Sequence, residues 1–258
     1  MRIDVNTSLG GFPWRRLPET TVPELLAAME RTGITGAWVF HLPALLWRDP
    51  MDSNDELIGW SAADPRLVPV PCVHPGLPRW QEELVRMHRM GARIVRADPT
   101  WYGLAPAGNE MQALAQEVAR LGMVLMLAVR LEDGRQRHPL DQTAELPASA
   151  VRALIREDPR LRLLVTHADR AFIEEVHFGS TPEEAARLWW DISWVWGPPE
   201  DHLETLLETV GPSRFVFGSG QPLRLAENPV ARLDLLDLPS EVRAMIESGN
   251  AHALLGAL

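Results

Sequence analysis

The stretch Arg214-Phe215-Val216-Phe217-Gly218-Ser219-Gly220-Gln221-Pro222 joins a short apolar run to a glycine-rich turn. An uninterrupted apolar run of this kind suits a strand buried on both faces, which is typical of parallel sheets. In open parallel sheets, ligands bind outside the carboxyl ends of the strands. Here that position holds Gly220, which has no side chain. The stretch therefore predicts a buried strand whose functional end contributes no reactive group.

The same pattern, an apolar run followed by a turn and a helix, recurs along the chain. Outside Phe215–Gly218, strands are expected at Arg2–Thr7, Ile34–His41, Leu67–His74, Ala92–Ala97, Met123–Arg130, Leu161–His167 and Leu188–Val195. Strands alternating with helices over short links indicate parallel β-α-β units. No Gly-x-Gly-x-x-Gly follows the first strand, as a dinucleotide-binding sheet would require. We therefore predict an α/β protein, a closed TIM-type (β/α)8 barrel, with residues 1–258 as a single domain.

The charge and composition exclude several classes of partner. The formal net charge is −10, and all 25 basic residues are arginine. An acidic protein repels phosphate groups, so we expect no binding to nucleic acid or to anionic lipid. The lack of lysine excludes Schiff-base catalysis. No segment has the roughly 18 uncharged apolar residues of a membrane span. We expect a cytoplasmic protein in which the single cysteine, Cys72, is buried and unreactive.

Polar side chains follow most of the predicted strands. The carboxyl ends of the strands form one mouth in a parallel barrel, so these residues are candidates for a shared site. His167 is followed by Asp169 and Arg170, and three titratable residues clustered at one strand end favour a functional role. The other candidates are Asn6, Ser8, His41, His74, Arg96, Asp98, Arg130 and the loop residue His138, with Asp191 as a structural partner. For His41 and His74, a hydrogen-bonded structural role is the alternative.

Short segments in a fixed order resemble the amidohydrolase superfamily, in the branch of aminocarboxymuconate semialdehyde decarboxylase and related hydrolases. They extend over nearly the whole chain: Ile3–Val5, Asn54–Leu57, Asp64–Leu67, Val73–Pro75, Gly91–Arg93 leading to Arg96, Thr166–His167, Asp191–Ser193, Phe217–Ser219 and Gly249–Ala251. The resemblance implies a TIM barrel with hydrolase or decarboxylase activity. Dimers are common among such proteins, so a homodimer is expected.

The resemblance also implies a metal site, and this chain departs from its pattern. Family members open with His-x-His, carry histidines after strands five and six, and place an aspartate after strand eight; these groups hold a zinc-type ion that activates water. The His-x-His positions match Asn6 and Ser8. The strand-five histidine is replaced near Arg130, and the aspartate matches Gly220. Because His167 alone remains, we expect no catalytic metal.

Three hypotheses for function follow. In the first, which we favour, a metal-free enzyme clamps a small carboxylate-bearing substrate between Arg96 and Arg130. His167 is its general acid or base, oriented by Asp169 or a neighbouring loop carboxylate. In the second, zinc or a similar metal is retained by a relocated set, made of His74, His138, His167 and Asp98. In the third, the barrel is catalytically inactive and binds a small molecule or a protein partner. Further substrate-binding candidates are His41, His74, His138, Asn6 and Ser8.

Overall fold

The computed structural model of the protein describes residues 1–195 and 201–256. The strands are β1 (Ile3–Leu9), β2 (Gly36–His41), β3 (Leu67–Pro69), β4 (Ile94–Ala97), β5 (Val124–Ala128), β6 (Arg162–Thr166), β7 (Leu188–Asp191) and β8 (Phe215–Val216). The α-helices are α1 (Val22–Thr32), α2 (Asn54–Ser61), α3 (Trp80–Arg89), α4 (Asn109–Arg120), α5 (Ala148–Ile155), α6 (Arg170–Phe178), α7 (Pro182–Ala185), α8 (His202–Thr209), α9 (Glu227–Leu235), α10 (Ser240–Ala244) and α11 (Asn250–Leu255). Short helical turns are η1 (Leu42–Leu46), η2 (Pro50–Ser53), η3 (Pro212–Arg214) and η4 (Met245–Gly249). No helix within the described ranges is long and apolar enough to cross a membrane.

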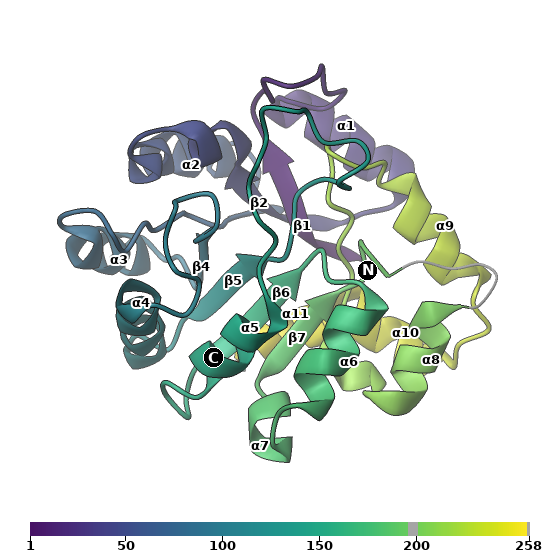
Figure 1. Ribbon diagram of the computed structural model, residues 1–258. Coiled ribbons are helices and arrows are strands. Elements are labelled where there is room, and N and C mark those ends of the chain that lie inside the picture. Colours follow the sequence, from purple (N-terminus) through teal and green to yellow (C-terminus); the bar gives the residue numbers. More distant parts are fainter. Residues whose placement is uncertain (196–200, 257–258) are drawn as a thin grey trace.

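The strands form one closed parallel barrel. β1 to β3 pair in chain order, and so do β4 to β8. Two seams join these sheets: the amide of Val73 donates to the Arg96 carbonyl at 2.9 Å, and the amide of Val5 donates to the Phe217 carbonyl at 3.0 Å. Helices surround the strands in chain order (Figure 1). The prediction of a TIM-type barrel is confirmed.

Side-chain alternation along the strands divides the core into an interior and an outer layer. On β5, Val124 and Met126 pack inside the barrel, while Leu125 and Leu127 pack against the helices. Successive residues of a strand point to opposite faces, which produces this division. Leu254 of α11 joins the interior cluster and closes the amino-terminal end of the barrel. The opposite end, called the mouth below, faces the viewer in Figure 1.

All the predicted strands except the first are shorter in the structure, and three of them are reduced to half their length or less; one of these, expected at Leu188–Val195, ends at Asp191. The strand expected at Leu67–His74 is reduced to β3, because the prolines at positions 69 and 71 have no N–H to donate to a neighbouring strand. The strand expected at Phe215–Gly218 ends at Val216. The sequence pattern also does not predict α6 and α9. The start of α6 coincides with the polar segment after His167, whose residues the sequence analysis assigns to a site.

Candidate functional site

Three polar side chains from different strands meet inside the mouth. Asn6 on β1, Asp191 on β7 and His167 directly after β6 are all buried. The amide nitrogen Nδ2 of Asn6 lies 2.7 Å from Oδ2 of Asp191 and 3.0 Å from Nε2 of His167. The other carboxylate oxygen of Asp191, Oδ1, accepts the backbone N–H of His167 at 2.8 Å. We call these three residues the mouth cluster.

The backbone of His167 is strained. Its φ of 58° lies in the left-handed region, which the backbone of residues other than glycine rarely adopts. Strain of this kind costs on the order of 1–3 kcal/mol and gathers at functional sites. Burial lowers the pKa of the imidazole well below its usual range, and the positive charges of Arg96, Arg224 and Arg130 lower it further. The ring is therefore neutral.

A second buried carboxylate, Asp4, lies beside the mouth cluster. Its Oδ1 accepts the backbone N–H of Asn6 at 3.0 Å and that of Ser219 at 2.9 Å. Burial raises the pKa of Asp4 to about 7; the hydrogen bonds from Ser219 and Asn6 oppose this rise, and the charge of Asp191 adds to it. The mouth therefore contains two carboxyl groups with raised pKa values, since burial also raises the pKa of Asp191.

The two arginines predicted to clamp a carboxylate are already paired with carboxylates of the protein. Nε and Nη2 of Arg96 each donate to an oxygen of Asp98 at 2.8 Å. Arg130 donates to Asp169 and to Glu145, each at 2.8 Å. One buried nitrogen of Arg96, Nη1, has no hydrogen-bond partner in the described part of the chain. A substrate carboxylate bound between Arg96 and Arg130 would therefore compete with these ion pairs.

Asp169 does not orient His167, which corrects the sequence prediction. Its Oδ1 accepts the backbone N–H of Phe172 at 2.9 Å and caps α6, and its Oδ2 binds Arg130. An aspartate directly before a helix is among the strongest N-caps, so this role follows from the local sequence. The carboxylate that holds His167 is Asp191 instead.

His41 and His74 make structural contacts outside the mouth cluster. The ring of His41 stacks on Trp60 at 4.7 Å, and its Nε2 lies 3.1 Å from Glu56 on α2. The ring of His74 stacks on Tyr102 at 4.3 Å. These positions agree with the structural alternative for both residues.

His138 and Ser8 also lie apart from His167. His138 belongs to the segment between β5 and α5, which crosses the mouth toward the segment after β1 (Figure 1). Its ring stacks on Trp14 at 4.6 Å. The Ser8 hydroxyl donates to the Gln221 carbonyl at 3.4 Å. Both residues therefore contribute to the walls of the mouth.

The residues at the implied metal positions do not fit a divalent cation. Nε2 of His167 faces the amide nitrogen of Asn6, and a Cβ at Gly220 would lie 2.8 Å from the same Nε2. Zinc sites normally use three or four His, Cys or carboxylate ligands. Within residues 1–195 and 201–256, no three such side chains are grouped to hold a metal. The structure thus does not assemble the relocated set of His74, His138, His167 and Asp98.

A side chain at Gly220 is expected to destabilise the protein. Gly220 has a φ of +75°, and its added Cβ would also lie 3.2 Å from the side chain of Arg224. We expect Gly220→Ala to lower the free energy of unfolding by about 1–3 kcal/mol, measured by urea unfolding. Gly134→Ala is the control, since a Cβ there meets nothing within 4 Å. Equal stability of the two variants would contradict the packing of His167 against Gly220.

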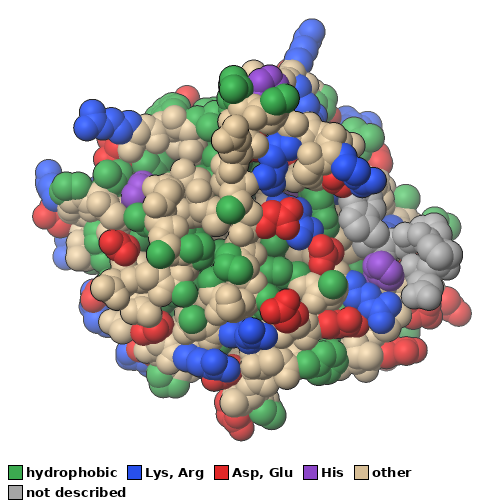
Figure 2. All heavy atoms as spheres, in the orientation of Figure 1, with side chains coloured by type: hydrophobic (Ala, Val, Ile, Leu, Met, Phe, Trp, Pro, Cys, Tyr) green, Lys and Arg blue, Asp and Glu red, His purple; other side chains and the backbone are tan. Residues whose placement is uncertain are grey.

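A cavity of about 250 Å³ opens at the mouth, and its lining includes Arg224 and Trp194. The guanidinium carbon of Arg224 lies 4.1 Å from the centre of the Trp194 ring. The same ring contacts His167 edge-on at 5.7 Å. Basic and acidic side chains are interspersed over the middle of this face (Figure 2). Trp194 therefore lies between the cavity that it lines and the buried imidazole, which is itself not part of the cavity lining.

The sequence pattern does not predict a site role for Asp4, Trp194 or Arg224. It indicates Asp191 only as a structural partner. One signal was present for Asp4: it lies two residues before Asn6, so strand alternation indicates the same inner face. Arg224 has no such signal, because it lies in the irregular segment between β8 and α9.

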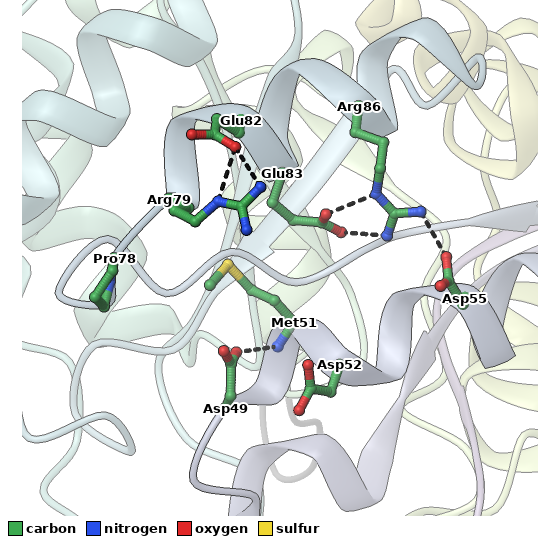
Figure 3. Close-up of a pocket in the computed structure, with 9 residues that line it drawn as sticks. All are labelled: Asp49, Met51, Asp52, Asp55, Pro78, Arg79, Glu82, Glu83 and Arg86. Carbon is green, nitrogen blue, oxygen red and sulfur yellow. Dashed lines mark hydrogen bonds and ion pairs between the residues drawn. The ribbon is translucent and has the colours of Figure 1, made fainter.

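Another hollow, of about 500 Å³, lies between η2, α2 and α3 (Figure 3). Its basic groups are neutralised within it: Arg86 binds Glu83 and Asp55, and Arg79 binds Glu82. Exposed ion pairs of this kind contribute little to stability. Both arginines that line this hollow are thus paired with carboxylates, and we assign no catalytic role to it.

Comparison with known proteins supports the resemblance to the amidohydrolase superfamily. The sequence profile of the amidohydrolase family matches residues 18–257. Among solved structures, 5-carboxyvanillate decarboxylase LigW from Sphingomonas paucimobilis is similar at 14% identity over 98% of each chain, with a TM-score of 0.74. A 2,6-dihydroxybenzoate decarboxylase from Rhizobium is similar at 16% identity over 99% of each chain, with a TM-score of 0.76.

A probable 2-pyrone-4,6-dicarboxylic acid hydrolase from Acinetobacter baumannii, solved with citric acid bound, has 15% identity over 99% of each chain and a TM-score of 0.65. No curated protein matches the chain. The structural likenesses agree with the barrel fold, and the family profile covers most of the sequence. The chain therefore belongs to the amidohydrolase family, as the sequence resemblance implies.

Proposed function

We propose that this protein is an amidohydrolase-type enzyme, a hydrolase or decarboxylase, that acts on a small carboxylate-bearing substrate at the barrel mouth. The observation that carries the proposal is His167: a neutral, buried imidazole in a strained backbone conformation beside a cavity. Perturbed titratable groups cluster at functional sites. The similar decarboxylases are named for small carboxylates, 5-carboxyvanillate and 2,6-dihydroxybenzoate, which supports this substrate class.

Positive charge near His167 favours an anionic substrate. The whole protein carries a net charge of −10, yet Arg96, Arg130 and Arg224 all act electrostatically on this imidazole. Arg96 and Arg130 are paired with carboxylates. Arg224 lines the cavity at the mouth, so we assign the attraction of a small anion mainly to it, whereas the overall charge disfavours polyanions such as nucleic acid. Nη1 of Arg96 and Nδ1 of His167 are buried without hydrogen-bond partners in the described ranges. Buried polar atoms in native proteins are normally paired, so we propose that both atoms gain a partner when the substrate is bound.

We further propose that the reaction uses these side chains without a zinc-type ion, because the donor set around Nε2 of His167 does not fit one. A homodimer is a second part of the proposal. It is supported by the exposed side chains of Leu46 and Trp47, which line an apolar hollow of about 430 Å³. Sedimentation analysis tests it. Cytoplasmic location remains a prediction from the sequence.

The proposed activity predicts turnover that depends on His167. A panel of small aromatic carboxylates, β-keto acids and lactones, assayed with metal-free and zinc- or manganese-supplemented protein, should yield at least one substrate. His167→Ala should lower its turnover by roughly 10²–10³-fold. Arg224→Gln should weaken carboxylate binding in calorimetry. Arg160→Gln is its control, because the Arg160 side chain is 65% exposed, pairs with Asp158 and lies before β6, away from the mouth.

Three results would overturn the proposal. Carboxylates that bind without any turnover would favour a catalytically inactive binding barrel. Turnover that is retained in His167→Ala would show that His167 is not needed for the reaction. Turnover that appears only after a metal is added would contradict the metal-free chemistry.

A further inference from the structure

We propose that Asn6, held by Asp191, fixes His167 as the Nδ1–H tautomer, so that His167 meets the substrate as a hydrogen-bond donor and not as a general base. Asn6 and Asp191 are positioning residues in this proposal, since they act through the imidazole. The inference rests on the proposed function, and it goes further by replacing the acid–base role expected for His167.

The tautomer follows from the donors and acceptors that meet in the mouth cluster. Nδ2 of Asn6 lies 2.7 Å from Oδ2 of Asp191, and a carboxylate oxygen accepts hydrogen bonds. The same amide nitrogen lies 3.0 Å from Nε2 of His167. An amide nitrogen has two hydrogens and accepts none, so Nε2 must be the acceptor. A neutral ring whose Nε2 accepts carries its proton on Nδ1.

The opposite orientation of the Asn6 amide is disfavoured. Rotating the amide by 180° would place its carbonyl oxygen against Oδ2 of Asp191, two acceptors at hydrogen-bond distance in a buried site. That arrangement would require a protonated Asp191. Oδ1 of Asp191 accepts the backbone N–H of His167 at 2.8 Å, which stabilises the ionised carboxylate. The geometry thus ties the backbone and the ring of His167 to one carboxylate.

The consequence is chemical. With its Nε2 lone pair directed at Asn6, His167 has no free lone pair to abstract a proton. Its Nδ1–H is buried, and although no acceptor in the described part of the chain meets normal hydrogen-bond geometry, the backbone of Arg130 lies near the ring. A neutral imidazole N–H can polarise a substrate carbonyl or stabilise a developing oxyanion. His167→Gln retains a side-chain N–H, so it should keep turnover within about tenfold of wild type, whereas His167→Ala should lose roughly 10²–10³-fold.

The tautomer can be measured without a substrate. Protein labelled with ¹⁵N-histidine is examined by long-range ¹H–¹⁵N correlation at neutral pH, and the His167 signals are identified by their loss in His167→Gln. We expect a protonated Nδ1 and an unprotonated Nε2. In Asn6→Ala and in Asn6→Leu, which lack the amide N–H, the preference for Nδ1–H should be lost. Thr7→Val is the control: it alters the neighbouring buried residue, whose hydroxyl donates to the Trp38 carbonyl, and should leave the tautomer unchanged.

The results separate this inference from the proposed function. A protonated Nε2 in the wild-type protein, or an unchanged tautomer in Asn6→Ala, would overturn the inference even if turnover is found. The expected tautomer in a protein without turnover would support the role of Asn6 and Asp191, and the proposed function would then be what fails. If Asn6→Ala does not fold, Asn6→Leu and the wild-type spectrum still decide.

Discussion

Replacing Arg96 by methionine is expected to lower the free energy of unfolding by about 3–5 kcal/mol. Arg96 and Asp98 form a bidentate ion pair in which each side chain is 1% exposed. The variant leaves the Asp98 carboxylate buried without its partner, which costs more than the pair contributes when intact. It also removes the cation that lies 3.8 Å from the centre of the Phe40 ring. Urea unfolding at pH 7 measures the loss.

Arg160 offers a matched control, because it forms the same bidentate contact with an aspartate two residues away. Its Nε and Nη2 lie 3.0 and 2.6 Å from the two oxygens of Asp158. The Arg160 side chain is 65% exposed, so solvent screens the pair and Arg160→Met should barely change stability. Adding Asp98→Asn to Arg96→Met should recover part of the loss. An unfolding midpoint of Arg96→Met close to wild type would contradict the buried pair.

This prediction bears on the substrate clamp. A loss of carboxylate binding in an Arg96 variant reports on substrate contact only if the variant is still folded. Arg224 is the better probe, since it lines the mouth cavity directly.

Replacing Asp4 by asparagine is expected to raise the free energy of unfolding at pH 8 by about 2–4 kcal/mol. Burial raises the pKa of Asp4 from 3.8 to about 7, so the folded protein favours the protonated carboxyl. Asparagine is neutral at every pH, and its Oδ1 can still accept the N–H groups of Asn6 and Ser219. The gain should therefore come without loss of these two hydrogen bonds.

The pH dependence has a definite sign. Below about pH 4 the Asp4 carboxyl is protonated in both the folded and the unfolded chain, and the variant gains nothing. As the pH rises toward 7, the unfolded chain gives up this proton first, so the wild-type protein loses stability relative to Asp4→Asn. Above about pH 7 the difference is constant. Unfolding at pH 5 and pH 8 measures it, with exposed Asp237→Asn as control. A difference that is equal at both pH values would show that Asp4 does not titrate in this range.

The barrel could be predicted from the sequence because its determinants are local. An apolar run such as Met123–Arg130, closed by a glycine turn before it and a polar segment after it, indicates a buried strand without reference to other strands. The strand edges were less certain where prolines interrupt a run, as in Leu67–His74, because proline removes a donor needed by a neighbouring strand.

The position of the candidate site at the mouth could also be predicted, but the hydrogen-bond partners of its residues could not. A polar residue at a strand end must lie at the mouth of a parallel barrel, which selected Asn6 and His167. The expected partner of His167 was Asp169, its near neighbour in sequence, but that carboxylate caps α6. Local capping competes with longer-range contacts, and sequence spacing does not reveal which one prevails.

The partners of His167 depend on closure of the barrel. Asn6 is 161 residues away in the chain, and Asp191 is 24 residues away. Residue types and spacing therefore suffice for the fold and for the acidic charge that disfavours nucleic acid. Which carboxylate holds His167, and which ring nitrogen is occupied, follow only when the closed barrel directs side chains of β1, β7 and the end of β6 into the same interior, since a hydrogen bond requires two atoms within about 3 Å.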